Sequence, residues 1–178
     1  MMAREALAKV GIDIKGAKVA LQGCGNVGSY AGMYIEEFGA KVVIVGDHTG
    51  TITNPDGIDM KALMAYIPTT PNRGINGFPG AEATDQNVLT ANVDLLMPCA
   101  LENQLTAENA NDVKAKVDCE GANGPTTPGA DEIFAQKGIT LVPDILANSG
   151  GVTVSYYDWV QNLQRDSWYY EAVHANNT

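Results

Sequence analysis

Three glycines in the segment QGCGNVGS could form a phosphate-binding turn, because Gly23, Gly25 and Gly28 are spaced as Gly-x-Gly-x-x-Gly. In a dinucleotide-binding turn, the first glycine permits a tight turn and the second lets the backbone approach a pyrophosphate. The third lets a helix pack close to the preceding strand. The backbone amides of Asn26 and Val27 would begin that helix and attract negative charge. Because glycine is common, the spacing alone is weak evidence, and the flanking elements have to support it.

The residues on both sides of the glycines predict a strand, a helix and a second strand. Residues 17–22 form a short apolar run that ends at Gly23, and residues 26–38 carry apolar side chains at helical spacing. Residues 41–45 are again continuously apolar, which is typical of a parallel strand covered on both faces. Asp47 follows this strand, where an acid can accept a hydrogen bond from the ribose 2′-hydroxyl of a dinucleotide. The sequence therefore predicts a dinucleotide site, with a plain glycine turn beside an ordinary acid as the alternative.

Predicted strands and helices alternate through the rest of the chain. After a hairpin within residues 47–59 and a loop over residues 68–80, we expect strands at residues 94–97, 116–119 and 139–142, and helices at residues 58–67, 107–114, 129–137 and 152–164. This alternation predicts an α/β, Rossmann-like, doubly wound and mostly parallel sheet with helices on both faces. We expect one dinucleotide-binding domain over residues 1–178, made of a lead-in helix (1–15), the Rossmann core (16–148) and a C-terminal helix with a truncated tail (149–178).

The composition excludes several classes of function. The formal net charge of −10 would repel nucleic acid and anionic membranes, so neither is expected as a partner. No apolar stretch approaches the roughly 20 residues that span a bilayer, and the N-terminal residues lack the apolar core of a signal peptide. The three cysteines include no Cys-x-x-Cys pair, and the two histidines show no metal-ligand spacing. We therefore expect no disulfide, no metal and a cytoplasmic location.

The cysteines are Cys24, Cys99 and Cys119, and each ends or closely follows a predicted strand. The carboxyl ends of parallel strands share one edge of the sheet, and ligands bind along that edge. We therefore expect all three thiols on the cofactor side. No cysteine chemistry is expected of them, because free cysteine is commonly a buried, inert, small apolar residue.

One resemblance runs in order from about residue 3 to residue 165. Its motifs are QGCGNVGS, NPDGID, GFPGAE, PCALENQLT, EGANGPTTPGADEIF and VPDILANSGGVTVSYYDWVQNLQ. This succession resembles the nucleotide-binding domain of the hexameric glutamate dehydrogenases, within the Glu/Leu/Phe/Val dehydrogenase superfamily. The related leucine and phenylalanine dehydrogenases share the fold but differ in the GANGPTT stretch. Cys24 stands where the family usually has an aromatic or aliphatic residue, and the chain after Arg165 diverges from the family.

The resemblance implies a reaction whose catalytic residues lie outside this sequence. Family members catalyse the reversible, NAD(P)-dependent oxidative deamination of L-glutamate to 2-oxoglutarate and ammonia. Their first domain carries a catalytic lysine and a proton-handling aspartate, and it builds most of the homohexamer interface. That domain is absent here, so the chain looks like an excised or engineered domain whose partner would be the missing half. We expect it to bind NAD without turnover; the alternative is a stand-alone dinucleotide-binding module or sensor.

The resemblance also implies coenzyme contacts beyond the glycine turn. Asn123, in GANG, would approach the nicotinamide ribose, and Asn148, in LANSGG, would bond the nicotinamide carboxamide. Cys99 and Ala100 would pack near the adenosine half. The simpler alternatives are a turn asparagine for Asn123, a helix cap for Asn148, and small residues at a crowded strand end for Cys99 and Ala100.

Two further positions are implied to face the substrate. Val152 and Ser155 lie one helical turn apart in GVTVS and would reach the glutamate side chain; otherwise Ser155 is an ordinary helix serine. The choice of coenzyme stays open. Asp47 favours NAD, because its charge would repel the 2′-phosphate of NADP, whereas His48 or Thr49 could help NADP to bind.

Overall fold

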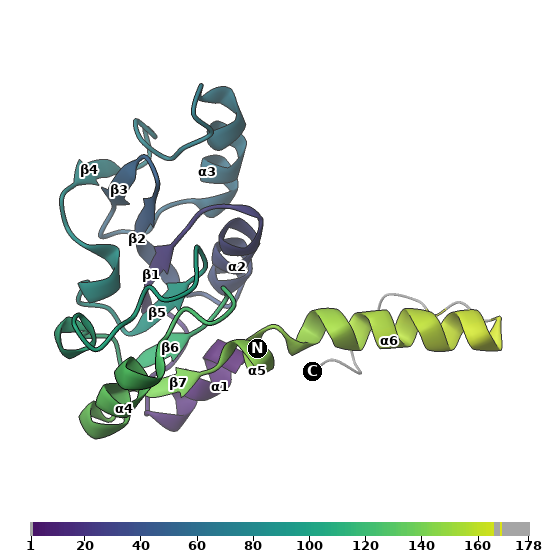
Figure 1. Ribbon diagram of the computed structural model, residues 1–178. Coiled ribbons are helices and arrows are strands. Elements are labelled where there is room, and N and C mark those ends of the chain that lie inside the picture. Colours follow the sequence, from purple (N-terminus) through teal and green to yellow (C-terminus); the bar gives the residue numbers. More distant parts are fainter. Residues whose placement is uncertain (1, 166–167, 169–178) are drawn as a thin grey trace.

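A computed structural model describes residues 2–165 and residue 168 of the chain. Its centre is a mixed sheet with the strand order β4-β3-β2-β1-β5-β6-β7 (Figure 1). The strands are β1 (Lys18–Gln22), β2 (Lys41–Asp47), β3 (Gly50–Thr53), β4 (Glu82–Thr84), β5 (Leu95–Pro98), β6 (Val117–Cys119) and β7 (Thr140–Val142). Across the sheet from β2 to β7 all pairings are parallel, whereas β3 pairs with β2 and β4 in antiparallel fashion. This confirms the predicted doubly wound, mostly parallel sheet.

Helices cover both faces of the sheet, as predicted. They are α1 (Met2–Lys9), α2 (Asn26–Glu37), α3 (Met60–Tyr66), α4 (Pro128–Lys137), α5 (Asp144–Ala147) and α6 (Ser149–Gln164), with short 3-10 turns η1 (Ile67–Thr69), η2 (Val88–Thr90) and η3 (Ala110–Asp112). Side chains of α1, α2 and α3 pack in one apolar cluster with the first face of the sheet. Side chains of α4, η2 and η3 pack in a second cluster with the other face.

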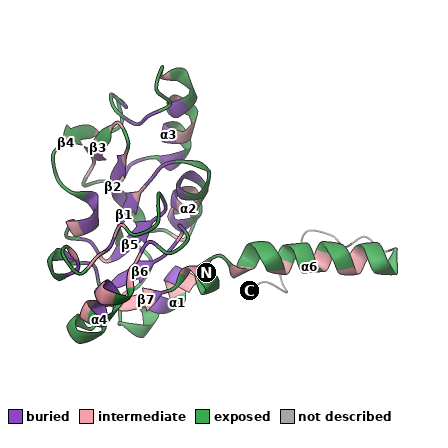
Figure 2. Ribbon diagram, in the orientation of Figure 1, coloured by how far each residue is buried: buried purple, intermediate pink, exposed green. Residues whose placement is uncertain are grey.

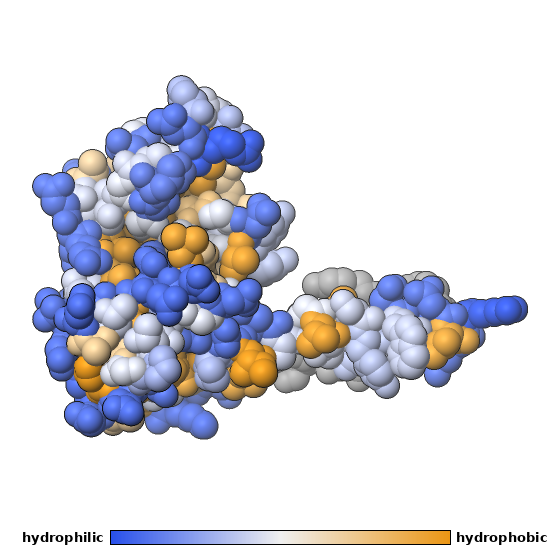
Figure 3. Space-filling view, viewed as in Figure 1, coloured by the Kyte–Doolittle hydropathy of each residue, from blue (hydrophilic) through white to orange (hydrophobic). Residues whose placement is uncertain are grey.

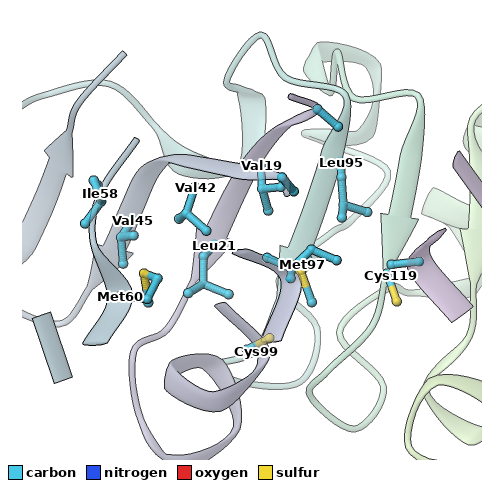
Figure 4. Packing of buried hydrophobic residues seen from close by; sticks show 14 of the residues in the cluster. Val19, Leu21, Val42, Val45, Ile58, Met60, Leu95, Met97, Cys99 and Cys119 are labelled. Atoms are coloured by element: carbon cyan, nitrogen blue, oxygen red, sulfur yellow. The ribbon is translucent and has the colours of Figure 1, made fainter. Parts of the chain in front are cut away.

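The strands are apolar without alternation because both of their faces are covered. Along β1, Val19 and Leu21 join the first cluster, whereas Ala20 between them joins the second. Figure 4 shows the first cluster at the sheet, where Leu21 lies among side chains of β2 and β5, and Figure 2 shows the buried strands between exposed helix surfaces. The strands that the apolar runs predicted are therefore apolar because both of their faces are buried.

The prediction of a helix at residues 107–114 is wrong, because only the short turn η3 forms there. Asn109 bonds the residues before it: its Oδ1 accepts from the backbone N of Thr106, and its Nδ2 donates to the carbonyl of Gln104. The Lys137 ammonium donates to the carbonyls of Ala110 and Val113. The carbonyl oxygens that a longer helix would use are thus bonded by a side chain from α4.

The other differences concern short elements and boundaries. The hairpin predicted in residues 47–59 forms, but its first strand is β2, so the pairing begins at Ile44 and ends at Thr53. The sequence did not predict β4 or α5, which have three and four residues. The last helix begins at Ser149 and not at residue 152. The predicted tail lies outside the described residues except for Trp168.

Helix α6 extends away from the sheet and the other helices (Figure 1). None of its residues is buried, and its exposed apolar side chains include Val152, Tyr156, Trp159 and Leu163. Figure 3 shows apolar groups along α6 that other described parts of the chain leave uncovered. Among the described residues, no helix is long and apolar enough to cross a membrane.

Asp118 is a fully buried acid in the middle of β6. Its Oδ2 accepts a single long hydrogen bond from the Thr126 hydroxyl (3.3 Å), and its Oδ1 has no hydrogen-bond partner among the described residues. Burial, and secondarily the Glu120 carboxylate, raise the pKa of Asp118 well above its usual range. Such a group opposes folding wherever an unfolded aspartate would be ionised.

Replacing Asp118 by asparagine is expected to stabilise the protein near neutral pH. Folding raises the pKa of Asp118. The contribution of Asp118 to the free energy of unfolding is therefore fully present below the pKa of an unfolded aspartate, and it is lost as the pH rises through the pKa of the folded state. Asp118→Asn should therefore gain about 1–3 kcal/mol near neutral pH and gain little in acid. Thermal unfolding across this pH range would test this, with exposed Asp131→Asn as the control. A gain that is independent of pH would contradict the assignment.

Candidate dinucleotide-binding site

The turn between β1 and α2 confirms the packing roles predicted for Gly23 and Gly28. Gly23 has a φ of +90°, and a Cβ there would lie 2.9 Å from the backbone of Ala100. A Cβ on Gly28 would overlap the carbonyl oxygen of Gly23, so only glycine lets α2 start this close to β1. Gly25 faces open space, and a Cβ on it would have no other atom within 4 Å. Two glycines therefore allow close packing, and one leaves the backbone accessible.

The N-terminus of α2 is open toward that accessible backbone. Its N-cap residue is Gly25, and the helix has no side-chain cap. The backbone N of Ser29 donates to the Gly25 carbonyl (2.9 Å), and the Ser29 hydroxyl donates to the Cys24 carbonyl (2.9 Å). These bonds hold the turn, while the first amides of the helix, at Asn26 and Val27, can bind an anion.

A cavity of about 810 Å³ adjoins this turn. It lies among the carboxyl ends of β1 and β2, the hairpin, the segment after β4 and the loop after β5. The structure brings five of the predicted site residues together in its wall: Gly23, Gly25, Asp47, Cys99 and Ala100. A cavity of this size at the carboxyl edge of the strands suits the adenosine half of a dinucleotide.

Asp47 lies in the cavity wall, but most of its hydrogen-bonding capacity is used within the protein. Its Oδ1 accepts from the backbone N (2.7 Å) and hydroxyl (2.6 Å) of Thr49, and its Oδ2 accepts from the backbone N of Ile75 (3.1 Å). The side chain is 8% exposed. Asp47 thus ties the hairpin to the loop that carries Arg73, another cavity residue. Its bond to a ribose hydroxyl stays a prediction.

The sequence did not single out two glutamines of this cavity. The Gln22 amide donates to the Gln104 side-chain oxygen (2.8 Å), and the Gln22 oxygen is buried without a partner among the described residues. Both glutamines line the cavity. The sequence did contain a signal for Gln22, because this polar residue ends an apolar strand directly before the glycines.

A second hollow, of about 280 Å³, reaches the same turn at Val27. Its wall includes Glu120 and Gly121 after β6 and Asn148 after α5. The Asn148 amide donates to the Gly121 carbonyl (3.2 Å). A Cβ on Gly121 would lie 2.5 Å from the Cys99 sulfur, so this glycine lets the loops after β5 and β6 converge beside the turn. The rest of its wall consists mainly of side chains of α1, α2 and the C-cap of α2, which include Met2, Ala3, Ala31, Tyr34, Ile35 and Phe38.

A model of the family described as Glutamate/Leucine/Phenylalanine/Valine dehydrogenase matches residues 1–177. The chain belongs to this family. Over 177 residues it is 49% identical to the NAD-specific glutamate dehydrogenase of Clostridioides difficile, covering 96% of this chain and 42% of that protein. Over 168 residues it is 49% identical to the NADP-specific glutamate dehydrogenase A1 of Halobacterium salinarum, covering 93% and 40%. The chain therefore spans about two fifths of the length of the curated relatives it matches.

Solved structures show the same fold. The hetero-hexameric glutamate dehydrogenase from Thermus thermophilus, in a Leu-bound form, superposes with a TM-score of 0.85 at 32% identity, covering 97% of this chain and 41% of that one. The glutamate dehydrogenase from Peptoniphilus asaccharolyticus has a TM-score of 0.80 at 39% identity, covering 99% and 40%. Within the Glu/Leu/Phe/Val dehydrogenase family, the chain corresponds to the C-terminal, nucleotide-binding domain.

Other residues predicted from the family lie outside the two hollows. Asn123 is exposed and lines neither of them. On α6, Val152 is 70% exposed, and the Ser155 hydroxyl donates to the Gly151 carbonyl. Asn148 occupies the N-cap position of α6, but its side chain makes no capping bond, so the helix-cap alternative does not account for it. Roles in binding for Asn123, Val152 and Ser155 stay predictions.

The cysteines lie on the predicted edge. Cys24 and Cys99 line the larger cavity, and Cys119 lines the second hollow. Burial raises the pKa of all three thiols, to about 12 for Cys99 and Cys119. They are therefore protonated at neutral pH and act as small apolar side chains. No group of three metal-binding side chains is found among residues 2–165.

Alanine substitutions should separate the packing glycines from the accessible one. Gly28→Ala is expected to cost about 3 kcal/mol or more, at the upper end of overpacking, because its Cβ meets a backbone oxygen. Gly25→Ala has room and an ordinary φ of −81°, so it should cost at most about 1 kcal/mol through the weaker N-cap. Thermal unfolding followed by circular dichroism measures both. Equal losses would mean that α2 does not approach β1 as described.

Proposed function

We propose that this domain binds NAD across the glycine turn between β1 and α2. The observation that supports this best is the turn itself, in which Gly23 and Gly28 hold α2 against β1 while Gly25 leaves the backbone open. The pyrophosphate would lie over the first amides of α2, where backbone N–H groups and the helix dipole favour negative charge. Cavities on the two sides of this point would take the two halves of the coenzyme.

Each half would meet residues that fit it. In the larger cavity, Asp47 would face the adenosine ribose, with Cys99 and Ala100 packed against the adenosine. At the second hollow, the Asn148 amide group already donates to Gly121, which leaves its Oδ1 to accept from the nicotinamide carboxamide. Asn123 would approach the nicotinamide ribose from the same loop as Gly121.

In the whole protein, we propose reversible oxidative deamination of L-glutamate to 2-oxoglutarate and ammonia. The nicotinamide supplies the hydride chemistry when bound, and this domain binds and orients it. The catalytic residues and most of the substrate site would lie in the first domain, with Val152 and Ser155 of α6 facing the substrate. The chain alone would then bind coenzyme without turnover. The parent would be a homohexamer, located in the cytoplasm.

We propose NAD as the preferred coenzyme on the basis of Asp47, whose carboxylate would repel a 2′-phosphate. Two cationic or titratable side chains, His48 and Arg73, also line the cavity and would attract that phosphate. One similar glutamate dehydrogenase is NAD-specific and another is NADP-specific. Direct titration therefore decides the preference.

The pure chain is expected to bind NAD and to produce no NADH from glutamate, because it would contain the coenzyme site without the catalytic lysine. Parallel calorimetric titrations with NAD and NADP, and an absorbance assay with glutamate, test the two parts. Gly25→Ala should weaken NAD binding while leaving the fold intact, because its methyl group would lie where the pyrophosphate approaches. Glutamate-dependent NADH formation that scales with chain concentration would overturn the proposed division of labour.

Replacing Asp47 should change coenzyme preference. Asp47→Ser is expected to lower the affinity for NAD by about one to two powers of ten, which corresponds to the loss of one charge-assisted hydrogen bond. It should raise the affinity for NADP, because the repulsive charge is removed. The same change loosens the bonds to Thr49 and Ile75. Thr49→Val is the matched control, because it removes the Thr49 hydroxyl bonds to Asp47 and Ile75 but keeps the carboxylate. If both variants change the NAD and NADP affinities alike, Asp47 does not contact the ribose.

A further inference from the structure

We infer that Glu120 and Asp144 are positioning residues for the nicotinamide half of the coenzyme. The inference rests on the proposed coenzyme site. It concerns two acids that no part of that proposal uses. They lie after β6 and β7, at the bases of the loops that carry Asn123 and Asn148.

The two acids join these loops through backbone N–H groups. The Glu120 Oε2 accepts from the backbone N of Asp144 (2.8 Å), and Glu120 is 4% exposed. The Asp144 Oδ2 accepts from the backbone N of Gly124 (2.8 Å), in the turn that follows Asn123. The acid after β6 therefore holds the loop after β7, and the acid after β7 holds the loop after β6.

Asn148 closes this arrangement into a ring. Its backbone N donates to the Asp144 carbonyl (2.8 Å), and its side-chain amide donates to the Gly121 carbonyl (3.2 Å). The path runs from Glu120 to Asp144, on to Asn148, and back to Gly121, the residue after Glu120. Each member limits where the Asn148 side chain can lie, including the Oδ1 that is proposed to meet the carboxamide.

The ring also connects to the larger cavity. The backbone N of Asn103 donates to the Gly124 carbonyl (2.9 Å), and the backbone N of Gln104 donates to the Pro125 carbonyl (2.8 Å). Gln104 lines the adenosine-side cavity. The loops after β5, β6 and β7 thus form one hydrogen-bonded unit along the edge where the coenzyme would lie.

Both acids act here as hydrogen-bond acceptors. Neither forms an ion pair with a described residue. Glu120 lines the second hollow, but its Oε2 bonds Asp144. A carboxylate that accepts backbone N–H groups orders the loops it joins. The expected consequence is a pre-organised place for the nicotinamide, with little effect on the adenosine half.

ADP-ribose allows this to be tested, because it lacks the nicotinamide and keeps the adenosine, the pyrophosphate and the second ribose. In the full chain, Glu120→Ala should lower NAD affinity by about fivefold, because it removes the bond that fixes the loop of Asn148. It should leave ADP-ribose affinity within about twofold. Asp144→Ala should lower both affinities, because it releases the turn after Asn123, and ADP-ribose keeps the ribose that Asn123 is proposed to approach. Glu120→Gln keeps an acceptor for the Asp144 amide, so it should retain the original ratio of the two affinities.

Asp131→Ala is the matched control, because this exposed acid lies on α4 and in neither loop. Calorimetry with NAD and ADP-ribose gives both affinities, and thermal unfolding reports folding of each variant. Equal NAD and ADP-ribose affinities in the unmodified chain, or a loss in Glu120→Gln as large as in Glu120→Ala, would overturn the inference. A parallel fall in both affinities for Glu120→Ala would do so too. Failure of the unmodified chain to bind either ligand would instead reject the proposed coenzyme site.

Discussion

The approach of α2 to the end of β1 is the constraint on which the rest of the site depends. A side chain on Gly28 would overlap the Gly23 carbonyl, and one on Gly23 would press on the backbone of Ala100. These contacts place the open N-terminus of α2 between two hollows at the carboxyl edge of the sheet. Without the two glycines, the helix would have to move away from the strand.

The acidic residues along this edge serve mainly to hold loops together. Asp47 connects the β2–β3 hairpin to the loop at Ile75, and Glu120 and Asp144 connect the loops after β6 and β7. All three accept backbone N–H groups, which satisfies donors that irregular loops would otherwise leave unpaired. Asp118 differs from these three acids, because one of its oxygens has no hydrogen-bond partner in the described part of the chain. Its burial opposes folding.

One edge of the sheet and one helix distinguish this domain. It contains an edge suited to hold a dinucleotide, and among its described residues it has no cluster suited to hold a metal. Helix α6 leaves its apolar side chains uncovered by the described part of the chain, and the matched relatives are more than twice as long.

The sequence by itself determined the fold class, the strand, helix and strand around the glycines, and the packing roles of Gly23 and Gly28. These depend on neighbours within about 30 residues, where spacing dictates geometry. Only the tertiary structure decided that Asp47 bonds Ile75, that Gln22 pairs with Gln104, and that no long helix forms around Asn109. In each of these cases a side chain bonds groups whose place depends on how the whole sheet is assembled. Local patterns cannot predict that, because the partner, such as Lys137 for the carbonyls of η3, comes from a different element.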